Sequence, residues 1–398
     1  MKRSIRWGGA AVAAAVCLVL AACGNAAAGG GDNDQGVTDS EILVGTTLPL
    51  TGAAAVAGND FKAGLQASID EVNNKGGIHG RKLRLVIYDD GFVTSRSVAN
   101  VLRLVQQDKV FALDMPVGSA GLPGTFPTVK SSGIPMFGPY LPPDPNLPTV
   151  FELATPHSEQ GAILADWVKK KGFTTVAYIG QDNDYGSAVL DGLTKEAQKI
   201  GLKLVATAKT EANSTNVGPA VLTAKQADPQ ALVLGTDGVQ ASLVLKQAQQ
   251  LGWKPTIIGE SSAANTGTTS AVGPAGAAAN GFYGAATAAL PTGDTPQVKA
   301  YRAAMQATAP DHVDALNALI AYGTNQVFFH ILDQMGDDLS WKNFVAKTEA
   351  LKDFDTGLLP PITFGPLPGG HTGAHSVLVA QYENGKWTVT DPYTSTQQ

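Results

Sequence analysis

The sequence predicts an α/β protein whose parallel β-sheets are covered by helices and divided between two lobes. Short apolar segments typical of buried strands alternate with segments whose apolar residues recur every three or four positions, as in helices. Glycines follow several of the helical segments, where a left-handed residue commonly ends a helix. The chain of 398 residues is also longer than one hydrophobic core usually organises. Together these features favour two lobes of alternating strands and helices.

The first half of the chain carries four strand-like segments. Helical spacing of apolar residues follows the first two, and Gly76 and Gly77 end the first helix. A helix from Ser158 ends in three lysines before Gly172, where positive charge complements the helix dipole. We place the first crossing between the lobes near Pro156. The strand-like segments are 42–48, 82–88, 110–115 and 151–156.

The same alternation returns in the second half. Helices are predicted over 189–200 and 243–251, and Gly201 and Gly252 end them. A longer helix is predicted around 316–331. Strands are predicted at 176–179, 202–206, 231–234 and 256–258, and a hairpin at 377–381 and 387–390 around Asn384 and Gly385.

The beginning of the chain has the layout of an export signal. An apolar run at 8–20 is shorter than the roughly 20 residues that span a bilayer. Three basic residues precede it: Lys2, Arg3 and Arg6. We therefore expect a signal peptide at 1–22.

Residues 20–23 (LAAC) resemble the lipobox of bacterial lipoproteins, in which the cysteine is lipidated and becomes the first mature residue. We expect Cys23 to be the lipidation site and the protein to be extracytoplasmic, anchored by lipid to the bacterial cell membrane. Cleavage would remove Cys17, so no intramolecular disulfide is expected. A stretch at 23–40, rich in Gly, Ala, Asn and Asp, is expected to be a flexible tether.

Charge and motifs exclude several classes of function. The full sequence has a formal charge of −6, and loss of three basic residues with the signal peptide changes it to −9, so nucleic acid is not expected as a partner. The sequence lacks the motifs of serine hydrolases, zinc proteases and phosphate-binding loops, so we expect no enzymatic activity and no cofactor. His371 and His375 have the spacing of a helical metal pair, but neighbouring glycines oppose a helix. We expect surface-loop histidines and no metal.

In open parallel sheets, ligands bind at the carboxyl ends of the strands, so the loops there carry the candidate ligand-binding residues. The loop after 110–115 contains Gly118 and Ser119, whose hydroxyl and neighbouring amides suit a carboxylate. A helix cap is the alternative role of this loop. The next such loop, stiffened by prolines, contains Tyr140 and Leu141.

Further candidates follow strands of the second half. Tyr185 follows the strand at 176–179, where an aromatic ring can close over a bound solute, with surface packing as the alternative. Asp237 and Glu260 follow two later strands, and their carboxylates suit an ammonium or amide group. For both acids, a solvated loop position is the alternative.

Several short motifs resemble the branched-chain amino acid binding family of ABC importers. They are 48–52 (LPLTG), 76–81 (GGIHGR), 88–90 (YDD), 185–186 (YG) and 321–323 (AYG). The resemblance covers most of the chain after the tether. It implies the type I periplasmic-binding fold, in which two doubly wound lobes are joined by a three-crossing hinge and close on a ligand. The lobes we expect are 41–156 with 284–355, and 157–283 with 356–398.

The resemblance also implies roles for the candidate residues. In the family, the loop that matches Gly118 and Ser119 binds the ligand carboxylate, and the position of Tyr185 faces the ligand. Glu260 matches a residue that holds the ligand ammonium. The match at Asp237 is less distinctive.

The chain departs from the amino acid binders of this family at two positions. Leu141 stands where a threonine often presents its hydroxyl to the carboxylate, and Ala57 stands where an aromatic wall occurs. Both changes disfavour leucine or valine as the ligand.

The function implied by the resemblance is that of a solute-binding lipoprotein of an ABC importer. The ligand would be a small polar metabolite, either an amino acid or a related amide or carboxylate. Its other partners would be the ABC permease subunits and, through the lipid, the membrane. A lipid-anchored sensor of the same fold that signals to a membrane receptor is the main alternative, and a secreted hydrolase is a third class.

Overall fold

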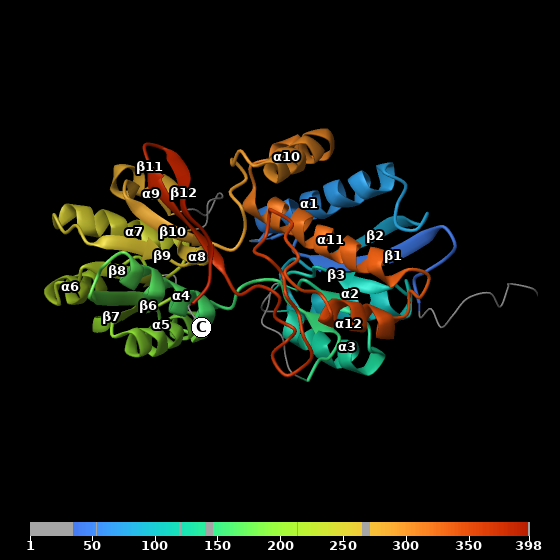
Figure 1. Cartoon of the computed structure of the whole chain (residues 1–398), viewed down its shortest axis with the longest axis horizontal. Helices are drawn as coiled ribbons and strands as arrows, with labels where there is room; N and C mark the ends of the chain where they lie inside the picture. Colours follow the sequence, from blue (N-terminus) through green and yellow to red (C-terminus); the bar gives the residue numbers. More distant parts are fainter. Residues whose placement is uncertain are drawn as a thin grey trace, which may run out of the picture.

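The computed structural model describes residues 35–52, 54–118, 121–139, 146–212, 214–264 and 271–396. It contains two mainly parallel β-sheets that lie side by side along the long axis of the molecule, each with helices packed on it (Figure 1). We call the part built on the first sheet the first lobe and the part built on the second sheet the second lobe. The predicted α/β class with two parallel-sheet lobes is therefore confirmed.

In the described part of the chain, the first sheet has five strands, all parallel, in the order β2-β1-β3-β4-β5. The strands are β1 (Glu41–Leu48), β2 (Lys82–Asp89), β3 (Ala112–Asp114), β4 (Met136–Phe137) and β5 (Val150–Phe151). The strand predicted at 110–115 forms only three residues of β3. Met115 has a positive φ of 48°, and this left-handed conformation ends the extended strand.

The second sheet, counted over the same described ranges, has seven strands in the order β12-β11-β10-β9-β8-β6-β7. They are β6 (Thr175–Gln181), β7 (Lys203–Thr210), β8 (Ala231–Gly235), β9 (Thr256–Gly259), β10 (Phe282–Ala286), β11 (Val377–Glu383) and β12 (Lys386–Thr394). Strands β6 to β10 are parallel, and β11 and β12 add an antiparallel hairpin. The predicted hairpin is confirmed, with Asn384 and Gly385 both at positive φ in its turn.

Helices cover both faces of each sheet, as in a doubly wound fold (Figure 1). Those of the first lobe are α1 (Ala55–Asn74), α2 (Thr94–Gln106), η1 (Leu122–Thr125), α3 (Phe126–Ser132), α10 (Pro296–Thr308), η3 (Pro310–His312), α11 (Leu316–Met335) and α12 (Trp341–Glu349). Those of the second lobe are α4 (His157–Lys170), α5 (Asp184–Ile200), α6 (Gly218–Gln226), α7 (Gly238–Gln250), α8 (Ser261–Ala264), α9 (Val272–Ala275) and η2 (Gly276–Ala279).

Side chains along a single strand alternate between the two faces of the sheet, and those of β1 and β6 pack against helices on both faces. In β1, Val44 lies in the core formed with α1 and α11, whereas Leu43 beside it lies in the core formed with α2 and α3. In β6, Val176 faces α4 and α5, whereas Ala177 faces α6 and α7. Successive residues of a strand point to opposite faces, so apolar residues at consecutive positions require helices on both sides.

The chain passes between the lobes three times, as the resemblance implied. It leaves the first sheet after β5, returns after β10 to pack α10 to α12 on the first lobe, and crosses again before β11. The expected boundary at 283/284 falls inside β10, which pairs with β11 along its whole length. The segment 356–374 was expected in the second lobe. Three of its residues instead lie in the first-lobe core: Leu358, Ile362 and Phe364.

The expected signal peptide at 1–22 and the expected lipidation site Cys23 lie outside the described residues. Among the helices of the described ranges, none combines the length and the apolar character that crossing a membrane requires.

Part of the expected tether at 23–40 is packed rather than free. The side-chain amide of Gln35 donates hydrogen bonds to the carbonyl oxygens of Val105 (3.1 Å) and Val110 (3.0 Å) in the first lobe. The tether prediction is therefore wrong for residues 35–37, because their polar groups find partners on the folded body.

Candidate ligand-binding site

The carboxyl ends of the parallel strands bring three candidate residues to one edge of the second sheet. Tyr185 lies in the first turn of α5 after β6, Asp237 lies between β8 and α7, and Glu260 directly follows β9. Because β6, β8 and β9 are neighbours in the sheet, these loops adjoin one another. The structure places Tyr185 in contact with Glu260, whereas the Asp237 carboxylate contacts other residues.

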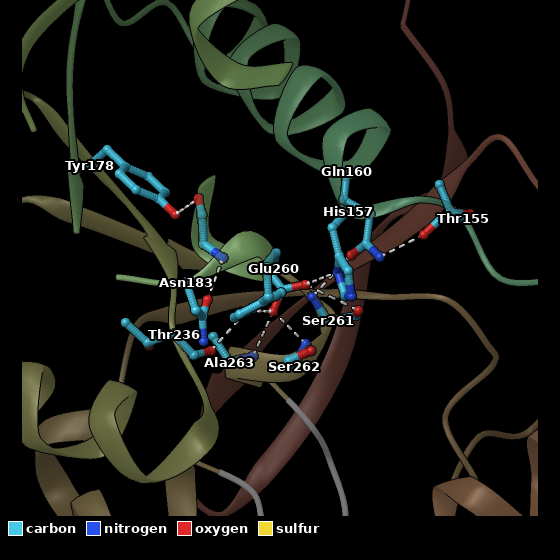
Figure 2. A network of polar contacts seen from close by, with 12 residues as sticks. Thr155, His157, Gln160, Tyr178, Asn183, Thr236, Glu260, Ser261, Ser262 and Ala263 are labelled. Carbon is cyan, nitrogen blue, oxygen red and sulfur yellow. Dashed lines mark hydrogen bonds and ion pairs between the residues drawn. The ribbon is translucent and has the colours of Figure 1, made fainter. Parts of the chain in front are cut away.

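Glu260 is fully buried, and hydrogen-bond donors of the second lobe surround its carboxylate (Figure 2). Its Oε1 accepts hydrogen bonds from the backbone N–H groups of Ser262 (2.7 Å) and Ala263 (3.1 Å) and from the Tyr185 hydroxyl. Its Oε2 lies 3.2 Å from Nδ1 of His157. Burying a carboxylate is costly unless donors compensate it, and here both oxygens are compensated within the lobe.

Tyr185 is half-buried rather than an exposed lid. Its hydroxyl donates to Glu260 and lies 3.0 Å from the carbonyl oxygen of Thr236. Burial, followed by the negative charge of Glu260, raises the pKa of Tyr185 well above its usual value. The phenol therefore stays protonated and holds the Glu260 carboxylate in one orientation.

His157 is a residue of this site that the sequence analysis did not identify. It is the first residue of α4, directly after Pro156, and its ring lies edge-on to that of Tyr185 with centroids 4.7 Å apart. Its side chain is 38% exposed while that of Glu260 is 0% exposed. In the sequence, the only indication of a role for His157 was its position just after a predicted crossing. Its contact with Tyr185 becomes visible only once α4 is packed against α5.

A second set of hydrogen bonds ties the site to the crossings between the lobes (Figure 2). The Gln160 amide donates to the Thr155 carbonyl (2.9 Å) and accepts from the backbone N–H of Ser261 (3.1 Å), beside Glu260. The Thr155 hydroxyl donates to the carbonyl of Ser376 (2.7 Å) on the last crossing. Hydrogen bonds thus connect the loop that contains Glu260 to two of the three crossings, so a shift of this loop can reach them.

Asp237 forms the N-cap of α7. Its Oδ1 accepts from the backbone N–H of Gln240 (2.8 Å), and its Oδ2 accepts from the side-chain amide of Gln181 (2.8 Å). Both oxygens therefore have partners that stabilise the start of the helix, where a negative charge is also favoured by the helix dipole.

Replacing Asp237 by alanine is expected to lower the free energy of unfolding by about 1 kcal/mol, because α7 loses its cap. Urea denaturation measures this change, and Asp237→Asn, which keeps an oxygen for the Gln240 N–H, is the matched control. Unchanged stability in Asp237→Ala would contradict the capping role.

The first-lobe candidates are only partly described. Gly118 has a positive φ of 142°, and its carbonyl oxygen accepts from the N–H groups of Gly121 and Leu122, both at 2.9 Å, at the start of η1. Among the described residues, no atom lies within 4 Å of a Cβ built on Gly118. Ser119, Tyr140 and Leu141 lie outside the described residues.

The two histidines predicted to lie in surface loops differ in their surroundings. His371 is buried and stacks on Phe151 with ring centroids 4.0 Å apart, so its surface prediction is wrong. Contact with Phe151 removes the ring from solvent despite the neighbouring glycines. His375 is exposed, and its Nδ1 lies 2.9 Å from the carboxylate of Glu159. The described residues contain no group of three or more potential ligands that could hold a metal ion.

A pocket of about 510 Å³ lies at the opposite edge of the second sheet, around the starts of β9 and β10. It is lined by residues such as Trp253, Phe282 and Tyr283, and Lys254 is the only charged residue among the lining residues. The network of buried polar groups around Glu260 is a stronger candidate for recognising a polar solute.

Comparison with known proteins places these features in a family. The family model described as periplasmic binding protein matches residues 41–386, most of the chain. A "Leucine-, isoleucine-, valine-, threonine-, and alanine-binding protein" of Pseudomonas aeruginosa is 24% identical over 233 residues, covering 57% of this chain and 62% of that protein. The chain thus spans about 60% of the length of this curated relative.

Two solved structures share the fold. A branched chain amino acid ABC transporter protein from Thermus thermophilus with bound valine has a TM-score of 0.75 at 16% identity, covering 90% of this chain and 98% of that one. A fatty acid ABC transporter substrate-binding protein from Thermomonospora curvata has a TM-score of 0.72 at 20% identity, covering 92% and 95%. The match of the family model to most of the chain, with the two-lobed fold, shows that this chain belongs to the periplasmic binding protein family.

Proposed function

We propose that this chain is the extracytoplasmic solute-binding lipoprotein of an ABC importer, and that it captures a small polar metabolite between its lobes. The observation that carries this proposal is the polar network around the buried Glu260, at the carboxyl ends of three parallel strands and linked to the crossings between lobes. The names of the relatives, which refer to amino acid binding and ABC transport, support the same function. An amino acid or a related amide or carboxylate is the proposed ligand.

In the proposed mechanism, the ligand bridges the two lobes and the lobes close around it. Gly118, Ser119, Tyr140 and Leu141 are the proposed first-lobe contacts, and the polar edge of the second lobe faces them. A ligand shifts the balance of open and closed forms only by the difference in its affinity for them, so contacts from both lobes are needed. The importer would recognise the closed form.

The second-lobe side of this site is the edge that contains Tyr185, Asp237 and Glu260. The proposed lobes follow the packing of the structure, with crossings near Pro156, after β10 and just before β11. The proposed lipid at Cys23 would hold the molecule at the membrane surface, beside the permease.

Calorimetry and small-angle X-ray scattering test this function on the purified mature protein. Amino acids, their amides, carboxylic acids and fatty acids are titrated, and native mass spectrometry identifies any metabolite that co-purifies. A bound solute of micromolar affinity, worth about 8 kcal/mol, is expected together with a smaller radius of gyration. No heat and an unchanged scattering profile across all of these compounds would contradict the proposal.

A further inference from the structure

His157 stands between the buried carboxylate of Glu260 and the solvent. Glu260 has no exposed side-chain surface, whereas more than a third of the His157 side chain is exposed. Nδ1 of the imidazole is turned toward Glu260 Oε2, so this contact leaves the second ring nitrogen, Nε2, for another partner. A solute that approaches from the solvent meets the imidazole before the carboxylate.

The Glu260 carboxylate has little capacity left for a ligand. Its Oε1 already accepts from the Tyr185 hydroxyl and two backbone N–H groups, and its Oε2 is bonded to His157 with the Ser261 hydroxyl 3.4 Å away. An ionised carboxylate offers about four acceptor positions. A ligand ammonium would therefore have to displace a donor that the lobe itself supplies.

The contact with Glu260 also sets the tautomer of the imidazole. A carboxylate only accepts hydrogen bonds, so the proton of a neutral His157 ring lies on Nδ1 and the lone pair lies on Nε2. Within the described ranges, Nε2 of His157 has no hydrogen-bond partner. Its lone pair is thus an acceptor that no described residue uses.

The charges at this edge of the sheet favour a donor as the partner of that lone pair. Asp182, Asp184 and Asp237 lie there with Glu260, and the nearby Lys209 is paired with Asp182 at 2.7 Å. An acidic edge attracts an ammonium group or an amide N–H and repels a carboxylate.

We propose that His157, rather than Glu260, is the second-lobe residue that contacts the ligand, and that its Nε2 accepts a hydrogen bond from an ammonium or amide N–H group. Glu260 is then a positioning residue, which fixes the imidazole from behind as carboxylates do for metal-binding histidines. This inference rests on the proposed function and narrows its ligand to solutes that carry an N–H donor.

The test compares three histidine variants by calorimetry. The probes are the standard amino acids, their primary amides and the matching carboxylic acids without the amino group. His157→Asn retains an amide that can reach Glu260 but has no atom at the Nε2 position, whereas His157→Gln extends to that position. His312→Asn is the matched control, because His312 is 33% exposed and its Nδ1 also contacts a carboxylate, that of Asp60, at 2.8 Å.

The expected result is that an amine or amide probe binds the wild type and binds His157→Asn about tenfold to hundredfold more weakly. His157→Gln should lose less affinity, and His312→Asn should bind as the wild type does. Equal binding by wild type and His157→Asn would overturn the inference while the proposed function stands, as would binding of the carboxylic acids alone. Binding of no probe at all would overturn both.

The positioning role of Glu260 has its own measurement. In protein labelled with ¹⁵N-histidine, at a pH at which the His157 ring is neutral, its signals, identified by their absence in His157→Asn, should show protonated Nδ1 and unprotonated Nε2. Glu260→Gln should move the proton toward Nε2 and weaken binding, and the double variant should bind no more weakly than either single one. An unchanged tautomer in Glu260→Gln, or additive losses in the double variant, would overturn the assignment.

Discussion

In the wild type, the free energy of unfolding is expected to fall by about 4 kcal/mol between about pH 4 and pH 7. Replacing Asp114 by asparagine is expected to remove this fall. Asp114 ends β3 and is fully buried, and this burial raises the pKa of its carboxyl group to about 7. Its partner is Asn325 on α11. In the amide orientation that satisfies all three groups, Asn325 donates to both Asp114 oxygens, at 2.9 and 3.1 Å, and accepts from the Ser68 hydroxyl.

The direction of this effect follows from proton binding. In the unfolded chain the carboxyl loses its proton near pH 4, whereas in the folded protein it keeps the proton until about pH 7. Between these values the folded state holds one more proton, so its stability falls as the pH rises. Above about pH 7 both states are ionised and the loss is complete. Asparagine does not titrate, so this part of the pH dependence disappears.

Urea denaturation at pH 5, 6, 7 and 8 measures the effect in the first lobe. Trp341 reports on that lobe, because its indole N–H donates to the carbonyl of Phe111, next to β3 (2.7 Å). The slopes against pH are compared rather than absolute stabilities, since asparagine also changes the contact with Asn325. Asp333→Asn, on the exposed side of α11, should keep the wild-type slope. If Asp114→Asn shows the same slope as the wild type, Asp114 is ionised throughout this range in the folded protein.

The fold could be predicted where residues within one segment determine its structure. Strands that are buried on both faces are continuous apolar runs, and β6, predicted at 176–179, is found at Thr175–Gln181. The short strands β4 and β5 have two residues each and are defined by their pairing partners, so the segment predicted at 151–156 contributes only Phe151 to β5. Helix α10 was not predicted, because four of its 13 residues are alanine and its buried side is limited to Val298, Tyr301 and Met305.

The residues of the candidate site could likewise be predicted only where their place along the chain determines where they lie. Tyr185 and Glu260 were identified because residues that follow parallel strands must meet at one edge of the sheet. The contact between Glu260 and His157 joins residues 103 positions apart, and it depends on where the start of α4 lies in space. His371 was misassigned for a related reason, since its burial comes from Phe151, more than 200 positions away.

The contact between α4 and α5 gives the second large prediction, that Gly192→Ala destabilises the second lobe by about 3 kcal/mol or more. The two helices approach most closely at two glycines. A Cβ on Gly192 would lie 1.7 Å from the carbonyl oxygen of Ser158, and a Cβ on Gly161 would lie 2.1 Å from that of Val189. Backbone atoms cannot rotate away as side chains do, so the helices themselves would have to separate.

The effect should exceed what the alanine gains as a better helix former, about 1 kcal/mol relative to glycine. It should also reach the binding site, since His157 begins α4 and Tyr185 lies in the first turn of α5. Moving the helices apart would pull both side chains away from Glu260. Gly192→Ala is therefore expected to weaken the binding of any solute that the wild type takes up, in addition to lowering stability.

Denaturation followed by the fluorescence of Trp167 measures this change, because Trp167 lies on α4 and its indole donates to Asp391 (3.1 Å). Asp191→Ala, one position before Gly192 on an exposed part of α5, is the matched control and should change stability by less than about 0.5 kcal/mol. A loss below about 1 kcal/mol in Gly192→Ala would show that α4 can shift without strain. The position of His157 would then be adjustable, and the fixed geometry proposed for its contact with the ligand would not hold.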